Sequence, residues 1–318
     1  MDPQFKKGYL LYEKNELTPA LVCPHSGPAI TTPIARDDHS ETIAFQCWKE
    51  LGGKLIISSL PRTQVFGIDF NRDIPPKNLS IDLYHQIVNE PSTRDLMRFK
   101  KKYAWLAKDE DDYYKRLNIY QNFWSEAEES SHVLLYHKSF TKMKAIPSIL
   151  DIIPIKGKKT VINSIIHGLN KKYEPFLRGI ERDFKQAVLI ETKRTINRIV
   201  KKYGKFDINL IEEDTNPNFR KDINNMLKYA NRFYIKKLKD KWNIANYLET
   251  IKSALRNSPH PNFTMAHVHD ATLAHGPKRK LLISPKKLIL ELEINAFVGY
   301  WYSEKIAEII KDLYKYLY

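Results

Sequence analysis

Short apolar segments alternate with longer amphipathic segments from the N-terminus to about residue 140, and this alternation limits the folds open to the chain. The apolar runs at residues 20–23, 55–60 and 132–136 are typical of buried strands. Between them, residues 38–51 have apolar side chains at helical spacing and are followed by a glycine pair, which predicts a helix. Alternating strands and helices favour a mostly parallel sheet with helices on both faces. We therefore predict an α/β fold.

The remaining patterns extend this sheet and its helical layers. Further apolar runs predict additional strands, and those late in the chain suggest antiparallel additions. The expected strands lie at residues 8–12, 64–70, 263–269, 280–283 and 287–294, and the expected helices at 80–89, 92–107, 110–128 and 303–317. We expect a three-layer sandwich around a mixed, largely parallel sheet.

The middle of the chain differs from both ends. Residues 155–259 are basic and rich in helix-forming residues, with an amphipathic pattern at 181–200, a candidate strand at 206–211 and two expected helices within 218–255. This stretch is either a helix-rich insertion or a helical layer over the sheet. The expected segments are the N-terminal part of the core at 1–154, the helix-rich stretch at 155–259, and the C-terminal strands and helix that complete the core at 260–318.

The composition of the chain indicates which cellular compartment and which cysteine chemistry to expect. No apolar run reaches the roughly 18 residues of a membrane span, and the first residues lack the apolar segment of a signal peptide. We therefore expect a cytoplasmic protein with no membrane partner. Cys23 and Cys47 both lie in apolar surroundings, which is typical of small buried side chains rather than of a disulfide framework. Because Cys23 lies near His25, a thiolate nucleophile is the alternative.

The formal net charge is +15, from 52 Lys and Arg residues against 37 Asp and Glu residues. Such a surface attracts nucleic acid, anionic membranes or acidic substrates. Most basic residues are interleaved with acidic ones, which also fits the surface of a thermophilic protein. Aromatic residues near lysines could stack nucleic-acid bases, while their helical spacing is more commonly explained by core packing. These residues are Tyr120, Phe123, Trp124, Tyr229, Phe233 and Tyr234.

Two histidines follow apolar, strand-like runs. His25 lies in the segment Pro-His-Ser-Gly at 24–27, directly after the run at 20–23, and His137 follows the run at 133–136. A strand that ends in a histidine presents the imidazole at an edge of the sheet, where clefts form in open α/β sheets. Two histidines and a carboxylate are typical ligands of a catalytic zinc ion. The alternative for each histidine is a buried structural role.

The expected carboxylate ligand lies near the first histidine. The following segment offers three candidates, Asp37, Asp38 and Glu41. Asp38 and Glu41 also have the spacing of a capping box at a helix start, and the two roles are compatible. A further acidic pair, Glu291 and Glu293, lies in a run that reads as a buried strand, where an unpaired charge is costly.

Arginine and asparagine side chains form the next group. Arg62, Asn71 and Arg72 suit a carboxylate, because arginine binds it bidentately and asparagine can hold its second oxygen. These residues imply a small acidic substrate. The alternative is a surface ion pair of Arg72 with Asp69 or Asp73.

These motifs occur in a fixed order along the chain. They are Pro-His-Ser-Gly at 24–27, the acidic helix start, Ser-Leu-Pro-Arg at 59–62, Ile-Asp-Phe-Asn-Arg at 68–72, His-Lys-Ser at 137–139 and Leu-Glu-Ile-Asn at 292–295. In this order they resemble the N-formylglutamate amidohydrolase family, over residues 20 to about 140 and the strand near 293. That family shares the fold of zinc carboxypeptidases. The resemblance therefore implies a zinc-exopeptidase-like fold and a zinc-dependent amidohydrolase.

The resemblance also implies a role for each motif residue. His25, His137 and Glu41 would bind Zn²⁺, with Asp38 as the alternative to Glu41. Arg62 would steady the carbonyl oxygen of the substrate in the transition state.

The other implied roles concern the proton and the substrate. Glu293 would be the general base. Glu291, two residues earlier on the same face of the strand, is the alternative, in which case the other glutamate pairs with a lysine. The residues expected to contact the substrate are Ser26, Asn71, Arg72 and Ser139.

The sequence departs from the family pattern in two places. Lys138 follows the second histidine, and the glycine-rich segment before the last strand is reduced to His-Gly-Pro at 275–277, so the identity of the substrate does not transfer. We predict hydrolysis of an amide or related acyl bond in a small carboxylate-bearing compound. The alternatives are a basic nucleic-acid-binding protein, including one that acts on an RNA-linked acyl group, and a non-catalytic protein with this fold.

A rival metal site involves a different pair of histidines. His267 and His269 alternate along a predicted strand and would face the same side of it. Asp270 or His260 would supply the third ligand. The alternative is a pair of polar residues on a solvent-facing strand.

Overall fold

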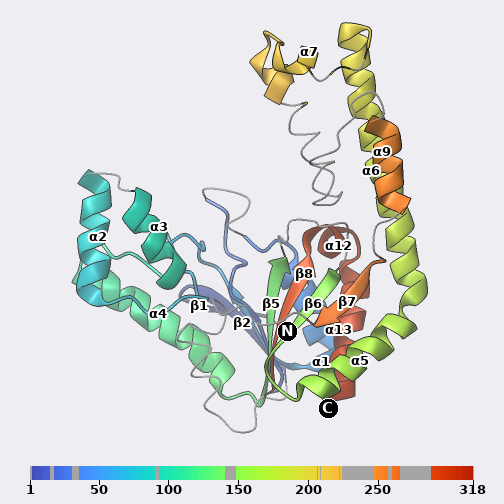
Figure 1. Cartoon of the computed structure of the whole chain (residues 1–318). Helices are drawn as coiled ribbons and strands as arrows, with labels where there is room; N and C mark the ends of the chain where they lie inside the picture. Colours follow the sequence, from blue (N-terminus) through green and yellow to red (C-terminus); the bar gives the residue numbers. More distant parts are fainter. Residues whose placement is uncertain are drawn as a thin grey trace. The chain divides into compact units, whose positions relative to one another are not determined.

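The computed structural model describes residues 2–14, 18–30, 36–89, 93–139, 148–205, 207, 209–221, 223, 247–256, 260–265 and 288–317. The chain divides into two compact units (Figure 1). The sheet unit comprises residues 1–139, 150–169 and 264–318, and the helical unit comprises residues 140–149 and 170–263. The main segment of the helical unit begins at residue 170 rather than 155, because most of α5 (Lys159–Lys172) belongs to the sheet unit.

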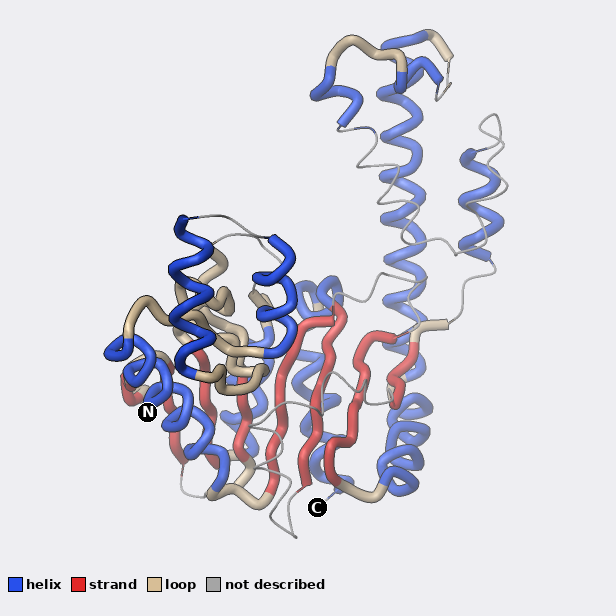
Figure 2. Tube along the Cα trace, turned by 60° about the vertical axis from the view of Figure 1, so that its left-hand side comes forward, coloured by secondary structure: helices blue, strands red, loops and turns tan. Residues whose placement is uncertain are grey.

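Among the described residues, eight strands form one mixed sheet in the order β1-β2-β4-β3-β5-β8-β6-β7. The central strands β4, β3, β5 and β8 run parallel, and β1, β2 and β6 make antiparallel pairs. This confirms the predicted α/β fold with a mixed, largely parallel sheet (Figure 2). The strands are β1 (Gln4–Lys6), β2 (Tyr9–Lys14), β3 (Ala20–Cys23), β4 (Gly53–Ser58), β5 (His132–Ser139), β6 (Ser148–Lys156), β7 (Asn262–Met265) and β8 (Leu288–Asn295).

Side chains alternate between the two faces of the sheet, and helices cover each face. On one face, Ala20, Val22 and Leu135 pack with aromatic side chains of α4 (Glu110–Glu128). On the other face, α1 (Ser40–Leu51) contacts β3, β4 and β5, and it also packs against α13 (Ser303–Leu317). In Figure 1, α4 lies on one side of the strands, and α1 and α13 lie on the other. The expected sandwich is therefore present.

The remaining helices complete both units. They are α2 (Lys77–Asn89), α3 (Thr93–Lys102) and α12 (Ala296–Trp301) in the sheet unit, and α6 (Glu174–Tyr203), α7 (Asn209–Glu212) and α9 (Tyr247–Arg256) in the helical unit. The helix α7 replaces the end of the strand predicted at 206–211. The strand predicted at 280–283, and Tyr229, Phe233 and Tyr234, lie outside the described residues. Within the described part of the chain, none of the helices combines the length and apolar character needed to cross a bilayer.

Residues 64–70 form a loop rather than the predicted strand. The backbone carbonyls of Gly67 and Phe70 accept hydrogen bonds from Arg116 Nη1 at 2.8 Å and Trp124 Nε1 at 3.1 Å. The Phe70 ring stacks on Phe123 with the centroids 4.0 Å apart. Because Arg116, Phe123 and Trp124 all lie on α4, side chains of a helix replace a neighbouring strand as the partners of this segment. The prediction was wrong because the apolar alternation here reflects packing against α4.

The first turn of α1 lacks the predicted capping box. The helix begins at Ser40, and its N-cap residue His39 has a left-handed φ of 69° with no side-chain cap. Asp38 Oδ2 instead accepts a hydrogen bond from Lys138 Nζ at 2.7 Å, and Glu41 is ion-paired with Arg36. The two carboxylates that would have capped the helix are therefore used in ion pairs.

His132, at the start of β5, gives the sheet unit a pH-dependent contact. Its Nδ1 lies 2.9 Å from the hydroxyl of Tyr314 on α13. Burial lowers the pKa of His132 from its ordinary value of 6.5, so the unfolded chain takes up the proton first. The contribution is fully present above the unfolded pKa and is lost as the pH falls below it.

We therefore expect His132→Gln to weaken the loss of stability between pH 7.5 and 5.5. Urea unfolding midpoints of both proteins at the two pH values measure the difference. Because every other titrating group is common to both proteins, equal pH dependence would show that His132 does not contribute.

Candidate metal centre

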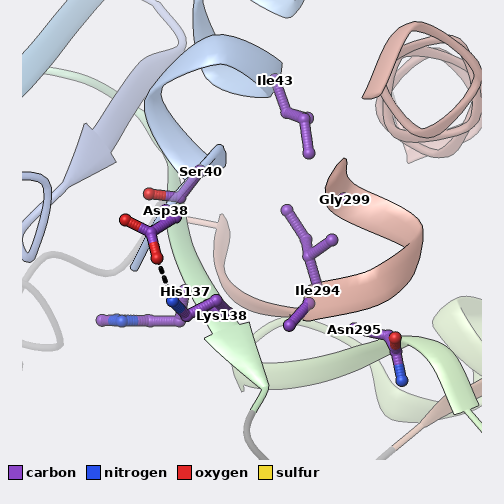
Figure 3. Close-up of a pocket in the computed structure, with 9 residues that line it drawn as sticks. Asp38, Ser40, Ile43, His137, Lys138, Ile294, Asn295 and Gly299 are labelled. Atoms are coloured by element: carbon purple, nitrogen blue, oxygen red, sulfur yellow. Dashed lines mark hydrogen bonds and ion pairs between the residues drawn. The ribbon is translucent and has the colours of Figure 1, made fainter. Parts of the chain in front are cut away.

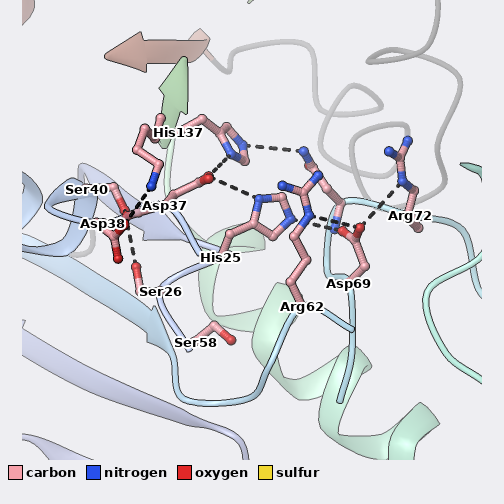
Figure 4. A network of polar contacts seen from close by, with 12 residues as sticks. His25, Ser26, Asp37, Asp38, Ser40, Ser58, Arg62, Asp69, Arg72 and His137 are labelled. Atoms are coloured by element: carbon pink, nitrogen blue, oxygen red, sulfur yellow. Dashed lines mark hydrogen bonds and ion pairs between the residues drawn. The ribbon is translucent and has the colours of Figure 1, made fainter. Parts of the chain in front are cut away.

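Three side chains of the metal-ligating type converge at the carboxyl ends of β3 and β5. His25 lies in the turn directly after β3, His137 lies near the end of β5, and Asp37 lies in the segment before α1. Asp37 Oδ2 lies 3.2 Å from His25 Nδ1 and 3.1 Å from His137 Nδ1 (Figure 4). The imidazole centroids are 5.0 Å apart, and all three side chains are buried. Both histidines therefore direct the same ring nitrogen at one carboxylate.

This arrangement fits a divalent cation. Ligands about 2.0–2.1 Å from a tetrahedral zinc ion lie about 3.3 Å from one another, close to the two separations in this cluster. The candidate ligand atoms of His25, Asp37 and His137 all lie within 4.8 Å of one another. Among the described residues, Asp37 Oδ1 is buried and has no hydrogen-bond partner. A buried carboxylate oxygen without a partner is costly, and a cation would satisfy it.

The protonation states also favour metal binding. Burial opposes ionisation of Asp37, but the hydrogen bonds with His137 and His25 outweigh it and hold its pKa well below the usual range. Burial lowers the pKa of His137, although Asp37 and Glu291 act in the opposite direction. The cluster therefore contains an ionised carboxylate and a neutral imidazole at His137, the forms in which these groups bind metals.

A second buried carboxylate orients the first histidine. Asp69 Oδ1 lies 2.9 Å from His25 Nε2 and accepts the backbone N–H of Asn71 at 3.0 Å. Arg62 Nε donates to the other oxygen at 3.3 Å, and Arg72 Nε lies 3.6 Å from it. Burial opposes ionisation of Asp69, but His25 and Arg62 outweigh it and lower its pKa. An ionised Asp69 accepts the Nε2 proton and leaves Nδ1 of His25 free for a metal, as in carboxylate–histidine–metal sites.

Arg62 and Glu293 lie beside this cluster. Glu293 is the register partner of His137 in the parallel pair β5–β8, so both side chains are on the same face of the sheet. Burial opposes the charge of Arg62, but the Asp69, Asp37 and Glu293 carboxylates outweigh it and raise its pKa. The guanidinium therefore stays charged among three carboxylates, with 29% of its side chain exposed.

The structure places Asp37, rather than Glu41 or Asp38, in the cluster with the two histidines. Glu41 is bound to Arg36, and Asp38 to Lys138. All three carboxylates lie within five positions of one another in the sequence, and the family resemblance pointed to the other two. Asp37 had no such signal apart from its position near His25.

Lys138 follows His137 on β5, but its side chain points to the other face of the sheet. Successive residues of β5 point to opposite faces, and the Lys138–Asp38 ion pair lies in a small pocket beside α1 and α12 (Figure 3). Ser40 and Asn295 also line this pocket, which has no room for a water molecule. The charge of Lys138 is thus directed at Asp38.

The expected substrate-contacting residues divide into two groups. Asn71 Nδ2 lies 3.5 Å from His137 Nε2, and Arg72 adjoins Asp69, so both border the cluster. Ser26 Oγ lies 3.2 Å from Ser40 Oγ and is buried. Ser139 is buried at the end of β5.

The other candidate sites are the two cysteines and the second pair of histidines. Burial raises the pKa of Cys23 well above its usual range and that of Cys47 to about 12, so both thiols are protonated at neutral pH and are poor nucleophiles. His267 and His269 lie outside the described residues. His260, their suggested partner, has its Nδ1 2.6 Å from Glu181 Oε2.

Comparison of the chain with protein-family models, with curated proteins and with solved structures finds no match.

Proposed function

We propose that the protein is a zinc-dependent hydrolase that cleaves an amide or related acyl bond in a small carboxylate-bearing substrate. The observation that carries the proposal is the buried cluster of His25, Asp37 and His137, in which one carboxylate oxygen has no partner among the described residues. A divalent ion held there would polarise a carbonyl group and lower the pKa of water.

The surrounding residues supply the remaining chemistry. Glu293, on the same face as His137, would accept the proton of the attacking water and pass it to the leaving amine. Arg62 keeps its charge and is partly exposed, so its guanidinium would stabilise negative charge that develops on the carbonyl oxygen. Asn71 and Arg72 border the cluster and would hold the substrate carboxylate.

Turnover of N-acyl amino acids by the zinc-loaded protein tests this proposal. We expect release of the free carboxylic acid and amine, and we expect Glu293→Gln to lower kcat by about 10²–10⁴-fold while the zinc content stays the same. Glu304→Gln, at an exposed position of α13, is the matched control. The absence of turnover across a panel of acyl groups, or full activity of Glu293→Gln, would overturn the assignment.

The two arginines should differ in their kinetic effects. We expect Arg62→Gln to lower kcat by about 10²–10³-fold, because its interaction with the carbonyl oxygen strengthens in the transition state. We expect Arg72→Gln mainly to raise KM, because it holds the unchanging carboxylate. Steady-state kinetics of both variants measure the split, and equal effects on kcat would contradict it.

A further inference from the structure

The positive charge of the chain is concentrated in the helical unit. That unit contains 23 Lys and Arg residues against 11 Asp and Glu residues, which gives it a net charge of +12 out of the total of +15. The larger sheet unit, with 29 basic and 26 acidic residues, has a net charge of only +3. A general surface adaptation would spread the excess over both units, so the asymmetry points to a function of the helical unit.

The excess of basic over acidic residues is densest along the second half of α6, the long helix in Figure 1. Residues 192–205 contain six basic residues and no acidic residue. Three of them have acidic neighbours: Arg194 with Glu191 at 3.4 Å, Lys205 with Asp207 at 3.4 Å, and Lys202 with Asp214. The basic residues of this segment, called the α6 basic segment below, are Lys193, Arg194, Arg198, Lys201, Lys202 and Lys205.

Two lysines of the α6 basic segment have no ion-pair partner in the part of the chain that the structure describes. They are Lys193 and Lys201, both exposed and eight residues apart, which places them about 80° apart around the helix axis. Cations in the last turn of a helix are favoured by its dipole, which accounts for Lys201 and Lys202. The helix dipole does not account for Lys193 and Arg194, which lie about two turns earlier.

The exposed surface of α6 suits a polyanion better than a lipid bilayer. Leu177, Phe184 and Val188 are buried, and α9 packs against the helix. Ile190 and Val200 are exposed, but they lie ten positions apart and do not form a continuous apolar face. A helix that lies on a membrane needs a broad exposed apolar face opposite its cations. Phosphate groups need only the accessible cations, and from Lys193 to Lys202 these extend over about 14 Å of the helix. A nucleic-acid duplex presents one negative charge per about 1.7 Å of its axis, so several phosphates fall within that length.

We propose that the α6 basic segment binds the phosphodiester backbone of a nucleic acid. The contacts are to phosphates, so binding tolerates different base sequences and depends strongly on salt. This function is separate from that of the metal centre and does not depend on it.

Fluorescence anisotropy with the full chain tests the proposal. The probes are a labelled 20-base-pair RNA duplex, a DNA duplex of the same sequence and the corresponding single-stranded RNA. With about four phosphate contacts, we expect the association constant for a duplex to fall about 10²-fold between 50 and 200 mM KCl. The RNA and DNA probes show which nucleic acid the protein prefers, and binding to either one supports the proposal.

A matched pair of triple variants locates the surface. Removal of three cations from the α6 basic segment should weaken duplex binding at least tenfold at 100 mM KCl and reduce the slope of log K against log salt by about three. Removal of three exposed cations from the sheet unit should change the affinity less than twofold. The first variant is Lys193→Gln, Arg194→Gln and Lys201→Gln, and the second is Arg98→Gln, Lys101→Gln and Lys115→Gln.

Three results would overturn the proposal. They are no anisotropy change at 50 mM KCl, equal losses in the two triple variants, and binding to vesicles of anionic lipid without binding to any of the nucleic-acid probes. Circular dichroism of each variant controls for folding. The salt dependence of the unmodified chain tests the electrostatic contact without any substitution.

Discussion

Replacement of Asp37 by alanine is expected to abolish stoichiometric zinc binding, whereas Glu41→Gln should leave it intact. Asp37 Oδ2 lies within 3.2 Å of the Nδ1 atoms of both His25 and His137, and Glu41 is paired with Arg36. Loss of a partner that only orients a ligand already costs about 10–100-fold in affinity, so loss of one of three ligands should cost more than about 100-fold. After dialysis, elemental analysis should find about one zinc per chain in the unmodified protein and in Glu41→Gln, and almost none in Asp37→Ala.

The controls separate metal loss from unfolding. Asp37→Ala removes a buried charge that interacts with two imidazoles, so its circular dichroism and urea unfolding are measured beside its metal content. A folded Asp37→Ala that retains zinc, together with loss of zinc in Glu41→Gln, would assign the ligand to Glu41, as the family resemblance implies. A competitive titration against a coloured chelator gives the affinities of all three proteins.

The second large effect is expected at Gly27, where alanine should destabilise the sheet unit by about 3 kcal/mol or more. A Cβ atom at this position would lie 1.8 Å from the backbone oxygen of Leu60 and 2.3 Å from its carbonyl carbon. Backbone atoms have little freedom to move away, unlike the end of a long side chain. The two loops that meet here carry His25 and Arg62, so forcing them apart should also weaken the contacts of both side chains with Asp69 and lower the zinc affinity.

Gly168 supplies the matched control for Gly27. It lies in α5 with nothing within 4 Å of an added Cβ, and it is exposed. Alanine should therefore leave zinc binding unchanged and raise the free energy of unfolding by up to about 1 kcal/mol, through its higher helix propensity. Urea unfolding with and without a chelator measures both variants. A Gly27→Ala protein as stable as Gly168→Ala would show that the two loops are not in this close contact.

The parts of the fold that follow local patterns were predictable. The strands β3, β4 and β5 are short apolar runs, and their alternation with helices indicated the parallel centre of the sheet. His25 and His137 are far apart in the sequence, but their positions at the ends of two such strands indicated that they meet. The carboxyl ends of adjacent parallel strands lie at one edge of the sheet, and β3 and β5 are neighbours.

The features that could not be predicted from the sequence depend on tertiary contacts. The choice of Asp37 over its acidic neighbours follows from the path of the backbone, in which its N–H donates to the carbonyl of His25 at 3.0 Å and His39 takes a left-handed conformation. No local pattern encodes this path. Asp69 was considered only as a partner for Arg72, because its contact with His25 joins residues 44 positions apart. The strand β6 contains Asp151 and Pro154, which break the apolar pattern, and it is stabilised by pairing with β8.

Anomalous diffraction at the zinc absorption edge, from crystals of the zinc-loaded protein, tests the metal centre most directly. The predicted result is one strong peak about 2.0–2.2 Å from Nδ1 of His25, Nδ1 of His137 and the carboxylate of Asp37. A well-ordered cluster without a peak, or a peak bound by Glu41 or by His267 and His269 instead, would contradict it.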